Sequence, residues 1–262
     1  TMIRTSSAPI IAVTVATAIS CLLLATAPHV ARAAEIKLLC TGALKPAMSE
    51  LISQFEKSSD HKVTLDSETS GALTGRIQKG EAADVVIATQ RQIANLEKQG
   101  RIAEGTPVDI AKGGVGVFVR KGAPQPDISS VEAFKRTLLA AQSIAHADPA
   151  RGGSTATYVV GLLGRLDIAA NIRAKTTIFP PGVFDTVARG DVEIGFGSIS
   201  EIGADPRIDL VGPLPTAIQN YTVFAAGIVA SSKQQDAGKA LIQFISSPVA
   251  AAVMKAKGFG PP

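Results

Sequence analysis

The chain has 262 residues, of which 46% are hydrophobic and 18% charged, and its formal net charge is +4. Of its 26 Lys+Arg residues, Arg4 and Arg32 lie in an N-terminal leader, so the rest carries 24 against 22 Asp+Glu. This near balance gives no support for binding to nucleic acid. Outside the leader the histidines are His61 and His146 and the cysteine is Cys40, which is no metal-ligand pattern. We expect no metal and no cofactor.

The first 33 residues have the three parts of a secretory signal peptide. Arg4 supplies positive charge, residues 10–27 form an apolar run, and Ala31 and Ala33 give the small-residue spacing that a signal peptidase cleaves. The apolar run continues past Cys21, which argues against lipidation there. We therefore expect cleavage after Ala33 and export to the periplasm.

From residue 35 onward, short apolar runs alternate with amphipathic helical patterns. Strands are predicted over 35–40, 61–66 and 83–89, and helices over 44–59, 70–77 and 91–100. This alternation is typical of a mostly parallel sheet flanked by helices.

A second unit begins near residue 112, where an apolar strand carries Gly and Pro at both ends. Further helices are predicted over 129–141, 155–166, 182–190, 233–247 and 248–259, and strands over 143–148, 175–180, 192–198 and 220–231. We expect a two-lobed α/β fold. Lobe 1 comprises 34–111 plus 223–262, lobe 2 comprises 112–222, and a ligand cleft lies between them.

Several predicted strands end in Ser, Thr and Gly just before a helix, as in "DSETSG" at residues 66–71. A helix start has unpaired N–H groups and partial positive charge. One such junction is ordinary N-cap chemistry, but several at the carboxyl ends of neighbouring strands favour an anion site.

Four stretches carry a resemblance to a known family: residues 44–89, "GVGVFVRKGAPQPDISSVEAFK", "AHADPARGG" and "SPVAAAVMKAKGFGPP". Through them the chain resembles the periplasmic solute-binding proteins of ABC importers, in the branch that includes molybdate-binding proteins. The resemblance implies a type II periplasmic-binding-protein fold that closes on its ligand. It also implies a small anionic ligand and an ABC permease in the inner membrane as partner, and we expect a monomer.

Only some of the residues that contact the oxyanion in that family are matched in this chain. Ser70 matches one side-chain contact, and Ser154 matches a backbone donor. Ala43 stands where molybdate binders have Ser, Ser198 stands near their Tyr, and another backbone donor falls on Pro180 or Pro181, where proline has no N–H. Each lost donor costs roughly 1–3 kcal/mol, so these departures disfavour molybdate.

Two cations lie beside the predicted cleft. Arg151 and Lys45 suit carboxylates and favour a small organic acid such as a tricarboxylate. The predicted ligand-binding residues are Thr41, Gly42, Ala43, Lys45, Thr69, Ser70, Gly71, Arg151, Ser154, Thr155 and Ser198.

Two functions stay open. The first is a transport receptor that binds an oxyanion or polycarboxylate for an importer. The second is an aconitate isomerase, since such enzymes resemble this family; it would interconvert trans- and cis-aconitate by an allylic proton shift, which needs a base. Candidate bases are His146, Glu68 and Tyr158, and their spacing forms no recognisable catalytic motif.

Overall fold

The computed structural model describes residues 1–2, 33–179 and 182–262, and Ala33–Pro262 form one compact unit by themselves. The predicted signal peptide falls almost wholly on residues 3–32, outside the described residues, and Cys21 lies there too. Export therefore stays a prediction.

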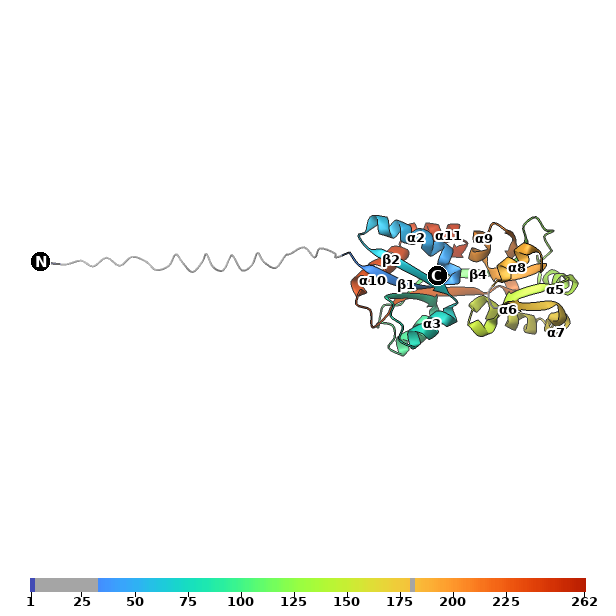
Figure 1. Ribbon diagram of the computed structural model, residues 1–262, viewed down its shortest axis with the longest axis horizontal. Helices are drawn as coiled ribbons and strands as arrows, with labels where there is room; N and C mark the ends of the chain where they lie inside the picture. The colour runs from blue at the N-terminus through green and yellow to red at the C-terminus, as the bar shows by residue number, and fades with distance from the viewer. Residues whose placement is uncertain (3–32, 180–181) are drawn as a thin grey trace. The chain divides into compact units, whose positions relative to one another are not determined.

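Within the described residues, one mixed sheet of ten strands runs through this unit (Figure 1). Its main path has the order β2-β1-β3-β9-β4-β7-β5-β6, and β8 and β10 each pair with β4. The strands are β1 (Glu35–Thr41), β2 (Lys62–Glu68), β3 (Val85–Thr89), β4 (Val108–Arg120), β5 (Ile144–Ala147), β6 (Thr176–Phe179), β7 (Ile194–Ser198), β8 (Ile208–Pro213), β9 (Tyr221–Ile228) and β10 (Phe259–Gly260).

Helices cover the sheet in two groups, one at each end of β4 (Figure 1). The first group is α2 (Lys45–Ser58), α3 (Ser70–Gln78), α4 (Gln90–Lys98), α10 (Gln235–Ile245) and α11 (Pro248–Ala256). The second is α5 (Val131–Ala140), α6 (Ser154–Arg165), α7 (Ala169–Ile172), α8 (Val183–Arg189) and α9 (Ile199–Ala204). Short 3-10 turns are η1 (Gly42–Leu44), η2 (Pro149–Arg151), η3 (Arg173–Lys175) and η4 (Thr216–Ile218).

Strand β4 belongs to both halves of the sheet. Its residues Ala111–Gly114 pair antiparallel with β9, and Val115–Phe118 pair antiparallel with β7. The outer pairs β1–β2, β1–β3, β5–β6 and β5–β7 are parallel, as the alternation of strands and helices predicted. We call the part built on β1, β2, β3, β9 and β10 the first lobe, and the part built on β5, β6, β7 and β8 the second lobe.

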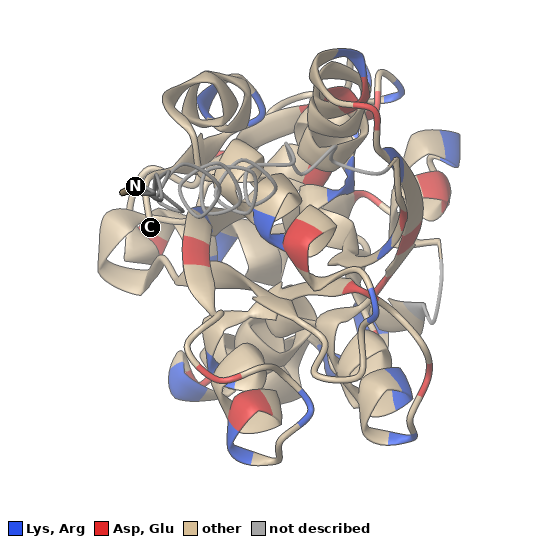
Figure 2. Cartoon of the chain, turned by 90° about the vertical axis from the view of Figure 1, so that its left-hand side faces the viewer, with Lys and Arg blue, Asp and Glu red and all other residues tan. Residues whose placement is uncertain are grey.

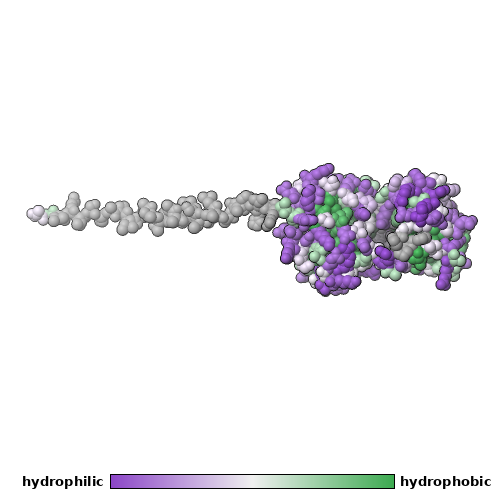
Figure 3. Space-filling view, viewed as in Figure 1, coloured by the Kyte–Doolittle hydropathy of each residue, from purple (hydrophilic) through white to green (hydrophobic). Residues whose placement is uncertain are grey.

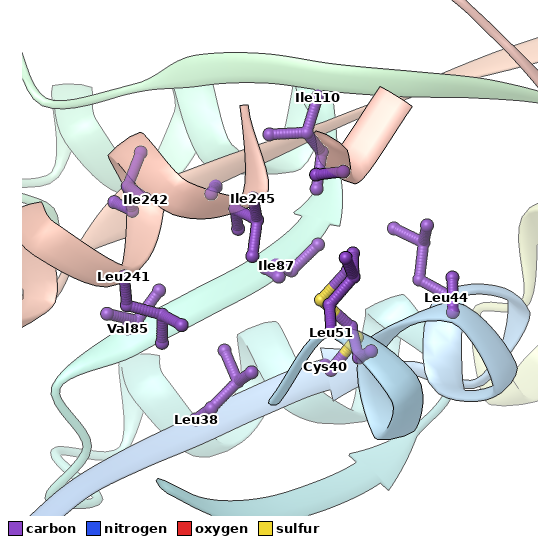
Figure 4. Packing of buried hydrophobic residues seen from close by; sticks show 14 of the residues in the cluster. Leu38, Cys40, Leu44, Leu51, Val85, Ile87, Ile110, Leu241, Ile242 and Ile245 are labelled. Atoms are coloured by element: carbon purple, nitrogen blue, oxygen red, sulfur yellow. The ribbon is translucent and has the colours of Figure 1, made fainter. Parts of the chain in front are cut away.

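Each lobe has its own hydrophobic core. In the first lobe Leu38 and Cys40 of β1 pack with Leu51 of α2, Ile87 of β3 and Leu241 of α10, all fully buried (Figure 4). Burial raises the pKa of the Cys40 thiol far above its ordinary value because the thiolate would be desolvated. Cys40 is therefore an unreactive core residue.

The second core lies between β4, β7 and helices α5 and α6. Phe134 of α5 meets Phe196 of β7 edge-on, with ring centroids 6.1 Å apart, and both rings are buried. Val117 of β4 and Val159 of α6 complete this contact set at full burial. Each lobe also has a further apolar cluster, around Leu73 and Val86 in the first and around Phe118 and Val187 in the second, so each lobe is stabilised by contacts of its own.

Several helices begin at a Ser or Thr whose side chain caps the helix, a pattern that can be recognised in the sequence. Thr89 caps α4 by accepting from Gln92 N–H, Ser130 caps α5, and Ser247 caps α11 directly before Pro248. Gly100 ends α4 with a φ of +67°, a conformation that glycine adopts without strain.

On the face that Figure 3 shows, hydrophilic residues predominate around smaller hydrophobic areas. In Figure 2, residues of both charge signs are scattered over the helices. Among the described residues, no single helix is long and apolar enough to cross a membrane. The bent pair α10 and α11 has the length and composition, but Leu241, Ile245 and Met254 of that pair are buried in the first core.

Candidate functional site

A cavity of about 430 Å³ lies where the carboxyl ends of the strands of the two lobes meet. The first lobe contributes the end of β1 with η1 and the end of β2 with the start of α3. The second lobe contributes the end of β5 with η2, the starts of α6 and α8, and the junction of β7 with α9. The lining residues are Thr41, Gly42, Ala43, Ser67, Glu68, Thr69, Ser70, His146, Ala147, Arg151, Gly153, Ser154, Thr155, Ala156, Val159, Gly182, Val183, Phe184, Phe196, Gly197, Ser198 and Glu201.

The start of α6 presents backbone donors to this cavity. Ser154, Thr155 and Ala156 form its first turn and line the cavity. The N-cap residue is Gly153, and no side chain caps these N–H groups. Because α6 has 12 residues, its dipole adds partial positive charge at this point. A helix start of this kind has the chemistry to hold an anion.

By contrast, the hydrogen-bonding groups at the start of α3 are largely paired with other groups of the protein. Thr69 caps the helix by accepting from Ala72 N–H at 3.2 Å. The Gly71 N–H donates to the Gly152 carbonyl at 3.2 Å, and the Ser70 hydroxyl donates to Thr41 Oγ1 at 2.9 Å. Ser70 and Thr69 line the cavity, but fewer donors are free here than at α6.

The same junction ties the two lobes together. The Thr69 hydroxyl donates to the Arg151 carbonyl at 2.5 Å, across 82 residues of sequence. The Arg151 side chain is exposed and lines the cavity, so its guanidinium is accessible to an anion. The contact between the α3 start and η2 closes one side of the cavity.

On another side, α9 joins the second lobe to the first. The Ser198 and Ser200 hydroxyls lie 2.9 Å apart, and the Ser200 hydroxyl donates to the Ala43 carbonyl at 2.7 Å. Ala43 and Ser198 line the cavity, and Ser200 lies buried behind them. Ser198 was expected to replace a ligand-contacting tyrosine; here it lines the cavity and its hydroxyl is paired with Ser200.

Glu201 in α9 is a half-buried residue whose carboxyl group lies in the same wall. Desolvation raises its pKa to about 7, and a backbone hydrogen bond from Ser198 opposes this shift only in part. A Cβ on Gly42 would come within 3.1 Å of the Glu201 Oε1 atom, so the absence of a side chain at Gly42 makes room for this carboxyl group.

A more open hollow adjoins the cavity. Gly42, Ser67, Phe184 and Glu201 line both, and Lys45 lines only the hollow, together with Pro46, Ala204, Asp205, Pro206 and Arg207. The Ser67 Oγ is buried and has no hydrogen-bond partner among the described residues. An unpaired buried hydroxyl indicates a missing partner such as a ligand or water.

The remaining predicted residues take different places. Glu68 and His146 line the cavity; Glu68 is exposed, and His146 is 4% exposed with Nδ1 2.8 Å from the Ala147 carbonyl. Tyr158 does not line it, because its hydroxyl donates to the Ile218 carbonyl at 2.7 Å and its ring packs on the second core. Gly71 lies behind the wall, against Gly152. Pro180 and Pro181 lie outside the described residues.

Sequence reasoning missed Ser67 and Glu201. The pattern "SISE" at 198–201 has the spacing of a capping box, but only half of the box forms. The Glu201 carboxyl group accepts from the Ser198 backbone N–H, whereas the Ser198 hydroxyl pairs with Ser200 and does not cap the helix. This pattern is the sequence signal from which a helix start at Ser198 could have been found. No sequence pattern indicates that the Ser67 hydroxyl lacks a hydrogen-bond partner within the described residues.

The cavity combines donors with an apolar wall. Val159, Val183, Phe184 and Phe196 line it beside the α6 start, so it can hold a carbon skeleton as well as a negative charge. Within the described ranges, no group of three His, Cys, Asp or Glu side chains is placed to hold a metal ion.

Two α/β lobes, a shared crossing strand and a cleft at the strand ends define the class of two-lobed binding proteins. The profile of the family described as bacterial extracellular solute-binding protein matches residues 36–260, and the chain belongs to this family. The resemblance drawn from sequence motifs is thereby confirmed.

Two curated proteins are similar along most of their length. The aconitate isomerase of Pseudomonas sp is 32% identical over 253 residues, covering 93% of this chain and 95% of the relative. The molybdate-binding protein ModA of Azotobacter vinelandii is 28% identical over 237 residues, covering 88% and 91%. The solved periplasmic molybdate-binding protein of Azotobacter vinelandii has a TM-score of 0.72 at 21% identity, covering 87% of this chain and 99% of that chain, which supports the two-lobed fold.

Proposed function

We propose that this protein binds a small organic polycarboxylate in the cleft between its lobes. The observation that carries the proposal is the first turn of α6, which presents N–H groups without a side-chain cap to a cavity of about 430 Å³. Pockets of roughly 300–1,000 Å³ hold organic ligands. A carboxylate takes the α6 donors, and the apolar wall contacts the carbon skeleton.

The site chemistry favours a carboxylate over a tetrahedral oxyanion. A cage for molybdate or sulfate surrounds the anion with hydrogen-bond donors, whereas the side chains of Val159, Val183 and Phe184 are apolar here. The exposed Arg151 guanidinium matches the planar geometry of a second carboxylate. Lys45 lies outside the cavity, at the adjoining hollow, and acts on the ligand at longer range.

The proposed role is that of an exported receptor. Its relatives include periplasmic molybdate-binding proteins, and the predicted signal peptide agrees with a periplasmic location. The protein then works as a monomer that closes on its ligand and delivers it to an ABC permease in the inner membrane.

A second candidate function is the isomerisation of aconitate. The 32% identity to an aconitate isomerase favours it, as does the placement of Glu201, whose pKa of about 7 suits proton transfer at neutral pH. In this reaction a base removes a proton from the CH₂ carbon of trans-aconitate. The double bond shifts by one position, and a proton returns to the other allylic carbon, so product and substrate are isomers.

The test is a thermal-shift panel with citrate, cis-aconitate, trans-aconitate, molybdate and sulfate on the purified protein. A ligand at about a hundred times its Kd stabilises by roughly 2.7 kcal/mol, which moves the Tm by about 5–11 °C in a protein of this size. We expect a shift with the polycarboxylates. A shift with molybdate alone contradicts the proposal.

One further measurement distinguishes a receptor from an isomerase. Proton NMR of trans-aconitate in D₂O follows both cis-aconitate formation and deuterium incorporation. A receptor binds without either change, whereas an isomerase gives both.

A further inference from the structure

We infer that Glu201 and Ser67 contact the ligand, and that a polycarboxylate binds together with one proton held between a ligand carboxyl group and the Glu201 carboxyl group. The inference rests on the proposed function, because it takes the ligand to be a polycarboxylate. It adds a specificity-determining pair that lies away from the α6 anion site.

The first observation is the position of the pair. Glu201 and Ser67 come from different lobes, α9 and the end of β2, and both line the wall that the cavity shares with the adjoining hollow. Gly42 faces Glu201 without a side chain, and a Cβ there would lie 3.1 Å from Oε1. The carboxyl group therefore reaches the cavity wall between the two lobes.

The second observation is the unpaired hydroxyl. The Ser67 Oγ is buried and has no hydrogen-bond partner among the described residues. Leaving a buried hydroxyl unpaired costs roughly 1–3 kcal/mol. A ligand oxygen in the shared wall removes this cost, and such an oxygen also lies within the region that Glu201 lines.

The third observation is the absence of a compensating charge. Helix α9 packs on β4 and β8 through Ile199 and Ile202, which face Gly114, Gly116 and Leu210. The titratable or charged side chains that line the walls with Glu201 are Glu68, His146 and Arg151 at the cavity and Lys45, Asp205 and Arg207 at the hollow. Within the described part of the chain, none of these side chains forms a salt bridge with Glu201. Arg207 is bound to Asp185 and Asp205.

These features determine which anions fit. An ionised Glu201 repels a ligand carboxylate, and a shared proton replaces this repulsion with a charge-assisted hydrogen bond. Desolvation already raises the Glu201 pKa to about 7, so the proton is available near neutral pH. A ligand carboxylate is itself ionised at this pH, so the shared proton is the one held by the Glu201 carboxyl group or taken up from solvent on binding.

The experiment is isothermal titration calorimetry of the wild-type protein with trans-aconitate, cis-aconitate and citrate at pH 7. Each titration is repeated in buffers with different ionisation enthalpies. The slope of observed enthalpy against ionisation enthalpy gives the number of protons taken up. A group with a pKa of about 7 is about half ionised at pH 7, so we expect uptake of about half a proton per ligand or more.

The Glu201→Gln variant keeps the shape of the side chain and an oxygen that accepts from Ser198. We expect its proton uptake to fall to near zero. Glu104→Gln is the matched control and keeps the wild-type slope, because Glu104 is an exposed turn residue whose side chain makes no hydrogen bond to the residues that the structure describes. Ser67→Ala is expected to weaken binding about tenfold while retaining the proton uptake.

The outcomes are distinct. Binding without proton uptake in the wild type contradicts this inference and leaves the proposed function standing. Uptake that persists in Glu201→Gln also contradicts it. A wild type that binds none of the three acids overturns the proposed function and this inference together.

Discussion

Gly71 and Gly152 meet backbone to backbone across the two lobes. The Gly71 N–H donates to the Gly152 carbonyl at 3.2 Å, and a Cβ on Gly71 would lie 2.7 Å from the Gly152 Cα. Real Cβ atoms do not approach other atoms this closely, so no side chain fits at this contact. Gly152 also has a φ of +72°, which favours glycine.

Gly71→Ala is expected to weaken ligand binding about tenfold or more, because overpacking costs typically 1–3 kcal/mol. The cost falls on the state in which the lobes are in contact. Calorimetric titration with the best ligand of the panel measures it. An unchanged affinity would mean that this contact is not part of the ligand-bound state.

Gly75→Ala is the matched control in the same helix. Among the described residues, nothing lies within 4 Å of a Cβ at Gly75. Replacing an interior helix glycine by alanine stabilises by roughly 0.5–1 kcal/mol, so we expect a higher Tm and unchanged affinity. The comparison separates helix propensity from the contact between lobes.

Ser154→Pro tests the donors of α6. Proline is tolerated at the first helical position, and Gly153 before it has φ −73° and ψ 128°, a conformation compatible with a following proline. The change removes one N–H from the cavity and is expected to cost roughly 1–3 kcal/mol of binding. Ser154→Ala removes only the hydroxyl and is expected to have a smaller effect. Equal effects from the two would assign the contact to the side chain.

Arg151→Met tests the proposed second carboxylate contact. It keeps an unbranched apolar stem and removes the guanidinium. We expect weaker binding of tricarboxylates and a shallower dependence of affinity on salt concentration, since screening acts on the lost charge. Titration at low and high NaCl checks this. The same salt dependence in both proteins would place Arg151 outside the site.

Glu81 is predicted to control acid stability. Its carboxylate accepts from Arg76 and pairs with Lys37, and these contacts lower its pKa from 4.5 to about 2. The stabilisation is therefore present above pH 4.5 and is lost as the pH falls toward 2. We expect Glu81→Gln to be less stable at pH 7 and to lose less stability on acidification, as measured by urea unfolding at pH 7 and pH 3. Parallel losses in both proteins contradict this.

In the ligand-free protein, Glu201 affects the pH dependence of stability in the direction opposite to Glu81. Its pKa is raised to about 7 by burial, so its contribution is fully present below pH 4.5 and is lost as the pH rises to 7. We expect Glu201→Gln to unfold with a Tm that varies less between pH 5 and 8 than that of the wild type. A thermal scan across this pH range is the measurement, and identical profiles would show that the carboxyl group is solvated.

Local patterns were sufficient to predict much of the fold. The alternation of apolar runs and helical periodicity predicted most strands and helices, including the helix that begins at Ser70. The pairing of β4 with both β9 and β7 was not predictable locally, since it joins segments about a hundred residues apart. Helix α9, with six residues, is too short to show helical periodicity, and β8 after it was missed as well.

The site was predictable where it depends on strand ends and helix starts. Residues such as Ser154 and Ser198 line the cavity because parallel strands place their carboxyl ends together. The use of each hydroxyl was not predictable, since Ser70 donates to Thr41 and Ser67 has no partner within the described residues. Tyr158 lies away from the cavity because its helix turns that face toward the second core.

The sheet order also determines an order of assembly. Strand β9 lies between β3 and β4 in the sheet, yet it is made of Tyr221–Ile228, close to the end of the chain. The second lobe is nearly continuous in sequence, so its contacts form between nearby segments at a low cost in loop entropy. The sheet of the first lobe is incomplete until β9 has been synthesised and has paired with β3 and β4. The core of this lobe also needs residues of α10 and α11. A chain shortened before residue 221 therefore retains a second lobe that can fold and leaves β3 as an exposed edge that is prone to aggregation.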